Sequence, residues 1–127
     1  MIVLDASAII QVLVGRDPGP ALLDAVAGDL AAPHILDAEV LSVLRGMVLG
    51  RVLPLEAAES ARRSYADLVL TRYEAALLAD RVWALRNQYT SYDAMYLALA
   101  EGLGVPLVTC DRKLDAGGHH AEVVVYA

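Results

Sequence analysis

Residues 91–114, SYDAMYLALAEGLGVPLVTCDRKL, join an amphipathic helix to a short apolar strand through a tight turn. The helical pattern covers residues 91–103, and five of the six residues in VPLVTC are apolar or β-branched, which is typical of a buried strand. Short apolar strands followed by helices occur elsewhere too, at MIVL and at LAAP. Strands that alternate with helices predict right-handed crossovers and a mostly parallel sheet covered on both faces.

The remaining patterns complete an α/β fold in three layers, with a central sheet of four to five strands flanked by helices. Strands are predicted at residues 2–4, 30–32, 68–71, 105–110 and 123–126. Further helices are predicted at residues 6–14, 20–27, 34–49, 55–68 and 73–86. There is no internal repeat or low-complexity linker, and 127 residues are enough for one core. We therefore predict a single domain over residues 1–127.

Composition limits the function classes. The net charge of −6 gives no long-range attraction to nucleic acid or anionic lipid, so any nucleic-acid role needs a local basic patch or bridging cations. One cysteine, no visible secretory signal and no apolar run near ~18 residues indicate a cytoplasmic protein without a membrane span. The mean hydropathy of +0.49 is high for a monomer and predicts apolar helix faces covered by another chain.

Four carboxylates are predicted at one edge of the sheet. Asp5 and Asp111 directly follow strands, Asp93 lies in the first turn of a helix, and Glu39 lies one to two turns into another. Because the carboxyl ends of parallel strands share an edge with the starts of the crossover helices, all four are expected together at the edge where ligands bind. Each acid alone has a structural explanation as a helix cap, a capping box with Thr90 or a solvated helix residue.

The set is harder to explain structurally. Two carboxylates about 4 Å apart repel each other by roughly 4 kcal/mol even at an effective dielectric constant near 20. A hard cation such as Mg²⁺, or Mn²⁺, prefers oxygen ligands and would relieve that repulsion. Such an ion can polarise a phosphate and lower the pKa of a water molecule. The pattern therefore predicts metal-dependent phosphodiester hydrolysis.

The same segments resemble PIN-domain ribonucleases, and specifically the VapC-type toxins of bacterial toxin–antitoxin pairs. The resemblance covers essentially the whole chain and is carried by MIVLDASAII, PHILDAEVLSVLRG and SYDAMYLALAEGLGVPLVTCDRKL. It implies a PIN-like fold and an endoribonuclease whose acidic quartet, with a metal-activated water, hydrolyses RNA. It also implies a homodimer and a VapB-type antitoxin that covers the acidic edge with an arginine or similar cation.

The resemblance assigns roles residue by residue. Asp5 and Asp93 match the direct metal ligands, and Glu39 and Asp111 complete the site directly or through water. Ser7 and Thr109 match small hydroxylated positions that support the acids. The chain departs from the family pattern at Ser42, where many relatives carry asparagine, and at Cys110, where a small apolar residue is usual; neither departure removes an acid.

Other polar and aromatic residues are candidates for a role at the site or in the structure. Arg112 and Lys113 directly follow Asp111, and a phosphate contact and a plain turn are both open for them. Asp37 lies about 200° from Glu39 on an ideal helix, so only one of the two can face the edge, and the resemblance selects Glu39. Structural roles are expected for the remaining candidates: Asp115, His34, His119, His120, Cys110, Arg62, Arg63, Tyr92 and Tyr96.

Two functions from other classes remain as alternatives. One is a catalytically silent PIN-like binding partner, against which the intact quartet argues. The other is a phospho-acceptor signalling domain, which needs an acidic pair after the first strand and a mid-chain aspartate. Here Ala6 and Ser7 follow Asp5, and no acid occurs between Glu39 and Glu56, so this alternative is disfavoured. The position of Ser7 also disfavours enzymes that need D-x-D or D-x-E motifs.

Overall fold

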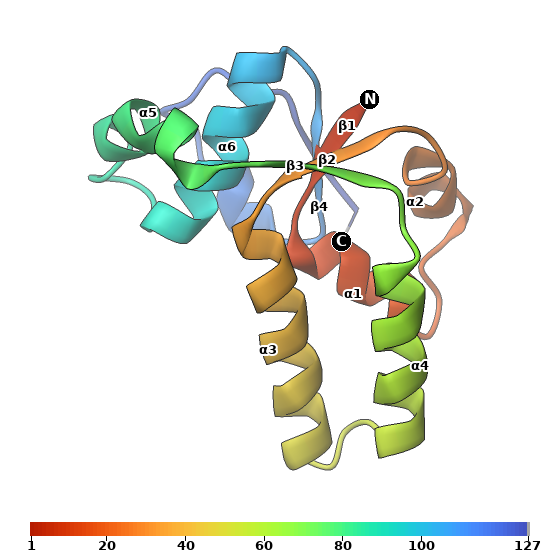
Figure 1. Cartoon of the computed structure of the whole chain (residues 1–127). Coiled ribbons are helices and arrows are strands. Elements are labelled where there is room, and N and C mark those ends of the chain that lie inside the picture. Colours follow the sequence, from red (N-terminus) through yellow and green to blue (C-terminus); the bar gives the residue numbers. More distant parts are fainter. Residues whose placement is uncertain (127) are drawn as a thin grey trace.

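A computed structural model describes residues 1–126, so Ala127, the last residue of the predicted domain, lies outside the described residues. Five parallel strands form one sheet in the order β3-β2-β1-β4-β5 (Figure 1). The strands are β1 Ile2–Leu4, β2 Leu30–Pro33, β3 Leu70–Tyr73, β4 Leu107–Thr109 and β5 Val123–Val125. The predicted α/β class is confirmed.

Within residues 1–126, six α-helices accompany the sheet. They are α1 Ala6–Val14, α2 Pro20–Ala25, α3 Ile35–Leu49, α4 Leu55–Ala66, α5 Ala79–Ala84 and α6 Ser91–Leu103. Two short 3₁₀ helices, η1 Ala75–Leu78 and η2 Arg112–Asp115, follow β3 and β4. No helix within residues 1–126 combines the length and apolarity needed to cross a membrane.

The central strand β1 is buried by its neighbours on both sides. Val3 pairs with Ala31 of β2 and with Leu107 of β4, and all three side chains are fully buried. Helix α6 packs against β1, β2 and β4, and α1 packs against β4 and the α3–α4 pair. Asp5, which directly follows β1, is thereby held in the middle of the sheet edge.

Helices α3 and α4 form an antiparallel hairpin that extends away from the sheet (Figure 1). Leu36, Val40 and Leu44 of α3 are spaced four apart, so they share one face of the helix, and all three are buried. Val43, between Val40 and Leu44 in sequence, is 39% exposed. The base of the hairpin, where α3 begins, brings Glu39 close to the sheet edge.

The sequence-based assignment was wrong between residues 68 and 86. The edge strand is Leu70–Tyr73, two residues later than predicted, and the expected helix over residues 73–86 is divided into η1 and α5. The helical segment begins with a 3₁₀ turn, Ala75–Leu78, and continues as an α-helix over Ala79–Ala84. Such 3₁₀ turns are frequent at the start of an α-helix. Leu78 and Leu85 are buried, at 8% and 1% exposure, and their spacing of seven residues places them on one helix face.

Candidate active site

Asp5 lies at the carboxyl end of β1 and begins α1. Its Oδ1 accepts hydrogen bonds from the Ser7 hydroxyl at 2.7 Å and from the backbone N–H of Ala8 at 3.1 Å. Its Oδ2 accepts a hydrogen bond from the Thr109 hydroxyl at 2.6 Å. Asp5 is therefore both the N-cap of a helix and a carboxylate held between the ends of two neighbouring strands.

Burial dominates the electrostatics of Asp5, whose exposed fraction is 6%. Loss of hydration raises its pKa above the ordinary value, and the three hydrogen bonds from Ser7, Thr109 and Ala8 lower it only in part. The nearby carboxylate of Asp111 raises the pKa of Asp5 further. A positive charge placed beside this carboxylate would therefore favour its ionised form.

Ser7 and Thr109 connect Asp5 to the loop after β4. The Thr109 hydroxyl accepts a hydrogen bond from the backbone N–H of Asp111 at 2.9 Å, and the two hydroxyls lie 3.1 Å apart. The Ser7 hydroxyl also accepts a hydrogen bond from the backbone N–H of Cys110 at 2.8 Å. These bonds give both residues the geometry of the supporting role expected for them, because they fix the carboxylate of Asp5 relative to Asp111.

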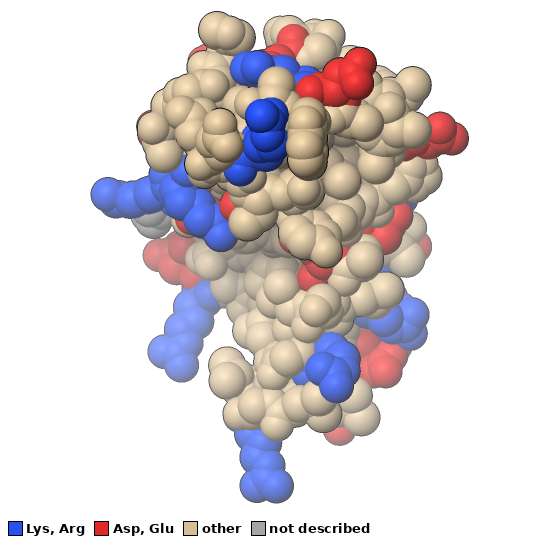
Figure 2. Space-filling view, turned by 90° about the vertical axis from the view of Figure 1, so that its left-hand side faces the viewer, with Lys and Arg blue, Asp and Glu red and all other residues tan. Residues whose placement is uncertain are grey.

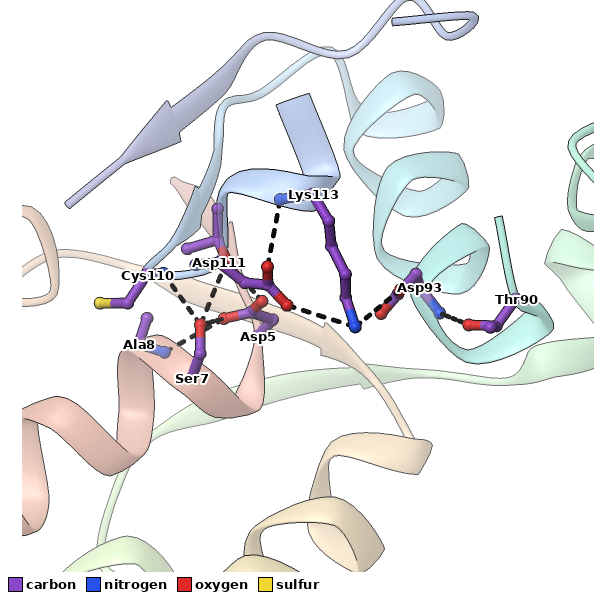
Figure 3. Close-up of polar contacts among 9 residues, drawn as sticks. Asp5, Ser7, Ala8, Thr90, Asp93, Cys110, Asp111 and Lys113 are labelled. Carbon is purple, nitrogen blue, oxygen red and sulfur yellow. Dashed lines mark hydrogen bonds and ion pairs between the residues drawn. The ribbon is translucent and has the colours of Figure 1, made fainter. Parts of the chain in front are cut away.

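Asp93 and Asp111 meet at the ammonium group of Lys113 (Figure 3). The Lys113 Nζ lies 3.5 Å from Asp93 Oδ2 and 3.3 Å from Asp111 Oδ2. The other oxygen of Asp111 accepts a hydrogen bond from the backbone N–H of Lys113 at 3.1 Å, which caps η2. Asp93, followed by Asp111, raises the pKa of Lys113, so the side chain is a cation at neutral pH.

Asp93 is positioned by the start of α6. The Thr90 hydroxyl accepts a hydrogen bond from the backbone N–H of Asp93 at 3.2 Å, which is the N-terminal half of the expected capping box. The carboxylate of Asp93 is directed to Lys113 instead of completing that box (Figure 3). The backbone of Asp93 thus takes part in the helix cap, and its side chain is available to the site.

Glu39 enters from α3 and is held by a different residue. The hydroxyl of Tyr96, a side chain only 2% exposed, donates a hydrogen bond to Glu39 Oε1. Asp37 is directed elsewhere: Arg72 binds both of its oxygens, at 2.8 and 2.9 Å, and Tyr65 donates to it at 2.6 Å. Only Glu39 of the two therefore remains available to the sheet edge.

The carboxylate oxygens suit a hard cation such as Mg²⁺. Asp5 uses three of roughly four acceptor positions for its hydrogen bonds, which leaves one for a metal. Asp93 and Asp111 already converge on one cation, Lys113. Within residues 1–126, however, no three His, Cys, Asp or Glu side chains are grouped closely enough to bind one ion. The carboxylate oxygens are of the kind that binds a metal ion. The acidic side chains would have to move closer together to bind one.

The remaining candidates lie outside this cluster. Arg112 is exposed and forms no ion pair with any residue in the range 1–126, Tyr92 is 58% exposed, and Asp115 is exposed. His119 is half-buried: its ring lies near Tyr89 and its Nε2 is 3.0 Å from the Leu114 carbonyl oxygen. Cys110 is likewise half-buried.

Two contacts of the site were missed by sequence reasoning. For Tyr96 a structural role was expected, and for Lys113 either a phosphate contact or a plain turn. A signal existed for both. Tyr96 lies three residues after Asp93 and so shares its helix face, and Lys113 lies two residues after Asp111 in a turn too short to carry it far.

A family model described as the PIN domain matches residues 2–119. The chain belongs to the PIN-domain family. This PIN domain is 35% identical to Ribonuclease VapC12 of Mycobacterium tuberculosis over 129 residues, which span 100% of both chains. It is 38% identical to Ribonuclease VapC1 of the same organism over 117 residues, or 90% of this chain and 88% of the relative. Within the family it is therefore of the VapC type.

Solved structures support the same fold for this PIN domain. PAE2754 from Pyrobaculum aerophilum superposes with a TM-score of 0.70 at 26% identity, covering 96% of this chain and 81% of that one. A toxin–antitoxin complex from Klebsiella pneumoniae gives a TM-score of 0.70 at 23% identity, with 98% and 96% covered. At that identity the second comparison supports the fold alone.

Proposed function

We propose that this PIN domain is a metal-dependent endoribonuclease and the toxin of a toxin–antitoxin pair. The observation that carries the proposal is the meeting of Asp93 and Asp111 around one cation, next to the buried Asp5. The relatives named as VapC ribonucleases match nearly the whole chain, which supports the same activity here. The quartet of Asp5, Glu39, Asp93 and Asp111 is the proposed catalytic centre.

Each acid has a distinct part in the proposed reaction. Asp5 and Asp93 would bind Mg²⁺ or Mn²⁺ directly, and Asp111 and Glu39 would complete the site directly or through water. Such an ion supplies Lewis-acid polarisation of a phosphate oxygen and lowers the pKa of a water molecule. Ser7 and Thr109 hold Asp5 so that its free acceptor position stays directed at the site.

The proposed reaction is attack of water on phosphorus, in line with the departing 3′ oxygen. It breaks the bond between phosphorus and that oxygen, so the products carry a 5′-phosphate and a 3′-hydroxyl. The 2′-hydroxyl takes no part in it. An enzyme that used the 2′-hydroxyl as nucleophile would instead leave a cyclic phosphate, which makes the product ends diagnostic.

The test is cleavage of a mixed RNA pool by antitoxin-free protein with Mg²⁺ or Mn²⁺, with EDTA, and with the Asp93→Asn variant. We expect metal-dependent cuts with 5′-phosphate ends, lost in the variant. The matched control is Asp115→Asn, which removes an exposed acid near the site and should cleave like the wild type. Cleavage that persists in EDTA or in Asp93→Asn would refute the mechanism.

We also propose a homodimer and an antitoxin partner. The fold neighbour from Klebsiella pneumoniae is a toxin–antitoxin complex, and a second neighbour, from Neisseria gonorrhoeae, is named FitAcB. Large apolar side chains at the surface, including Val69 at 91% and Leu77 at 73% exposure, fit burial by another chain. Sedimentation should give twice the 13.5 kDa chain mass for the toxin alone; a stable monomer would count against the dimer.

A further inference from the structure

Lys113 lies between two of the four acids of the proposed catalytic centre. Its ammonium group lies 3.5 Å from Asp93 and 3.3 Å from Asp111, so one positive charge is shared by two acids that come from α6 and from the end of β4. The backbone N–H of the same residue holds the second oxygen of Asp111. Lys113 therefore acts on this acidic pair through both its backbone and its side chain.

The ammonium and a divalent ion compete for the same oxygens. Oδ1 of Asp111 already accepts the backbone N–H of Lys113, so an ion shared by the two carboxylates would use Oδ2 of Asp111 and an oxygen of Asp93. The Nζ of Lys113 contacts Oδ2 of both residues. Two cations at that spacing repel each other, so entry of the metal requires the ammonium to leave.

Lys113 is free to move. Its side chain is 64% exposed, compared with 21% for Asp93 and 38% for Asp111, and it has a flexible four-carbon stem. Its backbone is fixed at η2, directly after Asp111, so a displaced ammonium stays beside the site. The anion that would arrive there with the metal is a phosphate of the RNA, and a lysine ammonium binds phosphate as a point charge.

We propose that Lys113 is an exchangeable counter-ion of the acidic site. Without metal it holds Asp93 and Asp111 together, and when the metal binds it turns to the substrate phosphate. This inference rests on the proposed function, because it needs both a metal and an RNA substrate. It assigns Lys113 the role of a positioning residue that acts through the acids before substrate binds, and through the phosphate afterwards.

The first experiment measures Mn²⁺ affinity by calorimetry on antitoxin-free protein. Lys113→Gln removes the competing cation and should bind Mn²⁺ about two- to thirtyfold more tightly, the range that two exposed ion pairs account for. The matched control is Arg112→Gln, which removes the same charge from the same turn where no ion pair involves it in the described part of the chain. Its affinity should stay within about twofold of the wild type.

A second readout checks folding and the metal-free role together. In EDTA, the melting temperature of Lys113→Gln should be lower than that of the wild type, because the two carboxylates then repel each other with no ammonium group between them. In saturating Mn²⁺ the two melting temperatures should converge. With saturating metal the variant should also show a higher KM for RNA, by about threefold, with a smaller change in kcat.

The outcomes separate this inference from the proposed function. If Asp93→Asn abolishes Mn²⁺ binding but Lys113→Gln binds Mn²⁺ like the wild type, the exchange is refuted and the metal site stands. Equal tightening in Lys113→Gln and Arg112→Gln would show a general charge effect and would also refute it. If Asp93→Asn binds Mn²⁺ as well as the wild type, the proposed metal site fails and the exchange fails with it.

Discussion

At the scale of single residues, the most constrained group is the buried carboxylate of Asp5. Three donors satisfy it, and two of them are hydroxyls from Ser7 and Thr109. The same Thr109 hydroxyl also accepts the backbone N–H of Asp111. One hydroxyl thus satisfies both the carboxylate of Asp5 and the backbone N–H of Asp111, so its removal would leave both groups without that hydrogen bond.

Thr109→Val preserves the shape of the side chain and removes that hydroxyl. We expect a loss of about 1.5–3 kcal/mol in the free energy of unfolding, because the lost hydrogen bond involves a charged group. The matched control is Thr71→Val on the exposed edge strand β3, which should change stability by less than about 0.5 kcal/mol. Urea denaturation without divalent ions measures both. Equal stability of the two variants would contradict the role assigned to Thr109.

The raised pKa of Asp5 predicts a pH dependence of stability. Between the unfolded value, ordinarily 3.8, and the higher folded value, the folded state binds more protons than the unfolded state. The contribution of Asp5 is therefore fully present below pH 3.8 and is lost as the pH rises through its folded pKa.

Asp5→Asn should abolish this part of the pH dependence. The free energy of unfolding of the wild type, in EDTA, should fall relative to that of Asp5→Asn as the pH is raised from 3.8 to neutrality. Denaturant titrations of both proteins across this range test the expectation. Parallel curves would show that Asp5 titrates as it does in the unfolded chain.

At the scale of elements, helix α6 contributes both to the core and to the candidate site. It buries a continuous apolar surface, supplies Asp93 in its first turn and places Tyr96 against Glu39. It ends at Gly104, whose φ of 67° and ψ of 35° lie in the left-handed region, so that β4 can begin directly afterwards. The position of the whole helix, and with it of Asp93, depends on this turn.

Two glycines near the end of α6 should respond to alanine in opposite ways. Gly104→Ala places a Cβ in a left-handed conformation and should destabilise the protein by about 1 kcal/mol. Gly102→Ala lies in the helix, has nothing within 4 Å of the added Cβ, and should stabilise the protein by about 0.5–1 kcal/mol. Thermal unfolding of both variants measures the pair. The same sign for both would contradict the assigned end of α6.

Elements with a strong local pattern were predictable from sequence, and elements set by tertiary contacts were not. Residues 91–103 were predicted as the helix that the structure has, because the pattern, the Thr90 cap and the terminal glycine agree. Strand β3 begins two residues later than predicted because pairing with β2 sets its position, and the segment's own sequence does not contain that contact. At the site, the edge position of the acids followed from topology. The Lys113 contacts and the Tyr96–Glu39 bond depend on side-chain placement.

At the scale of the whole molecule, the proposed function requires an acidic protein to bind an acidic substrate. The net charge is −6, and Figure 2 shows basic side chains in separate groups among acidic and uncharged ones. The face drawn in Figure 2 would neutralise few phosphates directly. Divalent ions at the acidic edge would therefore supply much of the attraction to RNA.

RNA binding should accordingly have a shallow dependence on monovalent salt and a strong dependence on divalent ions. We expect a log–log slope of magnitude about 2 or less, which corresponds to about three neutralised phosphates on a single strand. Fluorescence anisotropy in Ca²⁺ and in EDTA measures both effects, and Asp93→Asn should lose the divalent dependence. A steep salt slope in EDTA would instead indicate a basic binding surface.

The hydrogen bond between Thr109 and Asp5 joins residues 104 positions apart in the chain. During synthesis, the ribosome therefore releases Asp5 long before it has made the partners that orient that side chain. Likewise, β1 can pair with β4, one of its two neighbours in the sheet, only after β4 has been synthesised. A nascent chain that has not yet reached Thr109 lacks the hydroxyl that binds both Asp5 and the backbone of Asp111, so the orientation of Asp5 is set late in the synthesis of this domain.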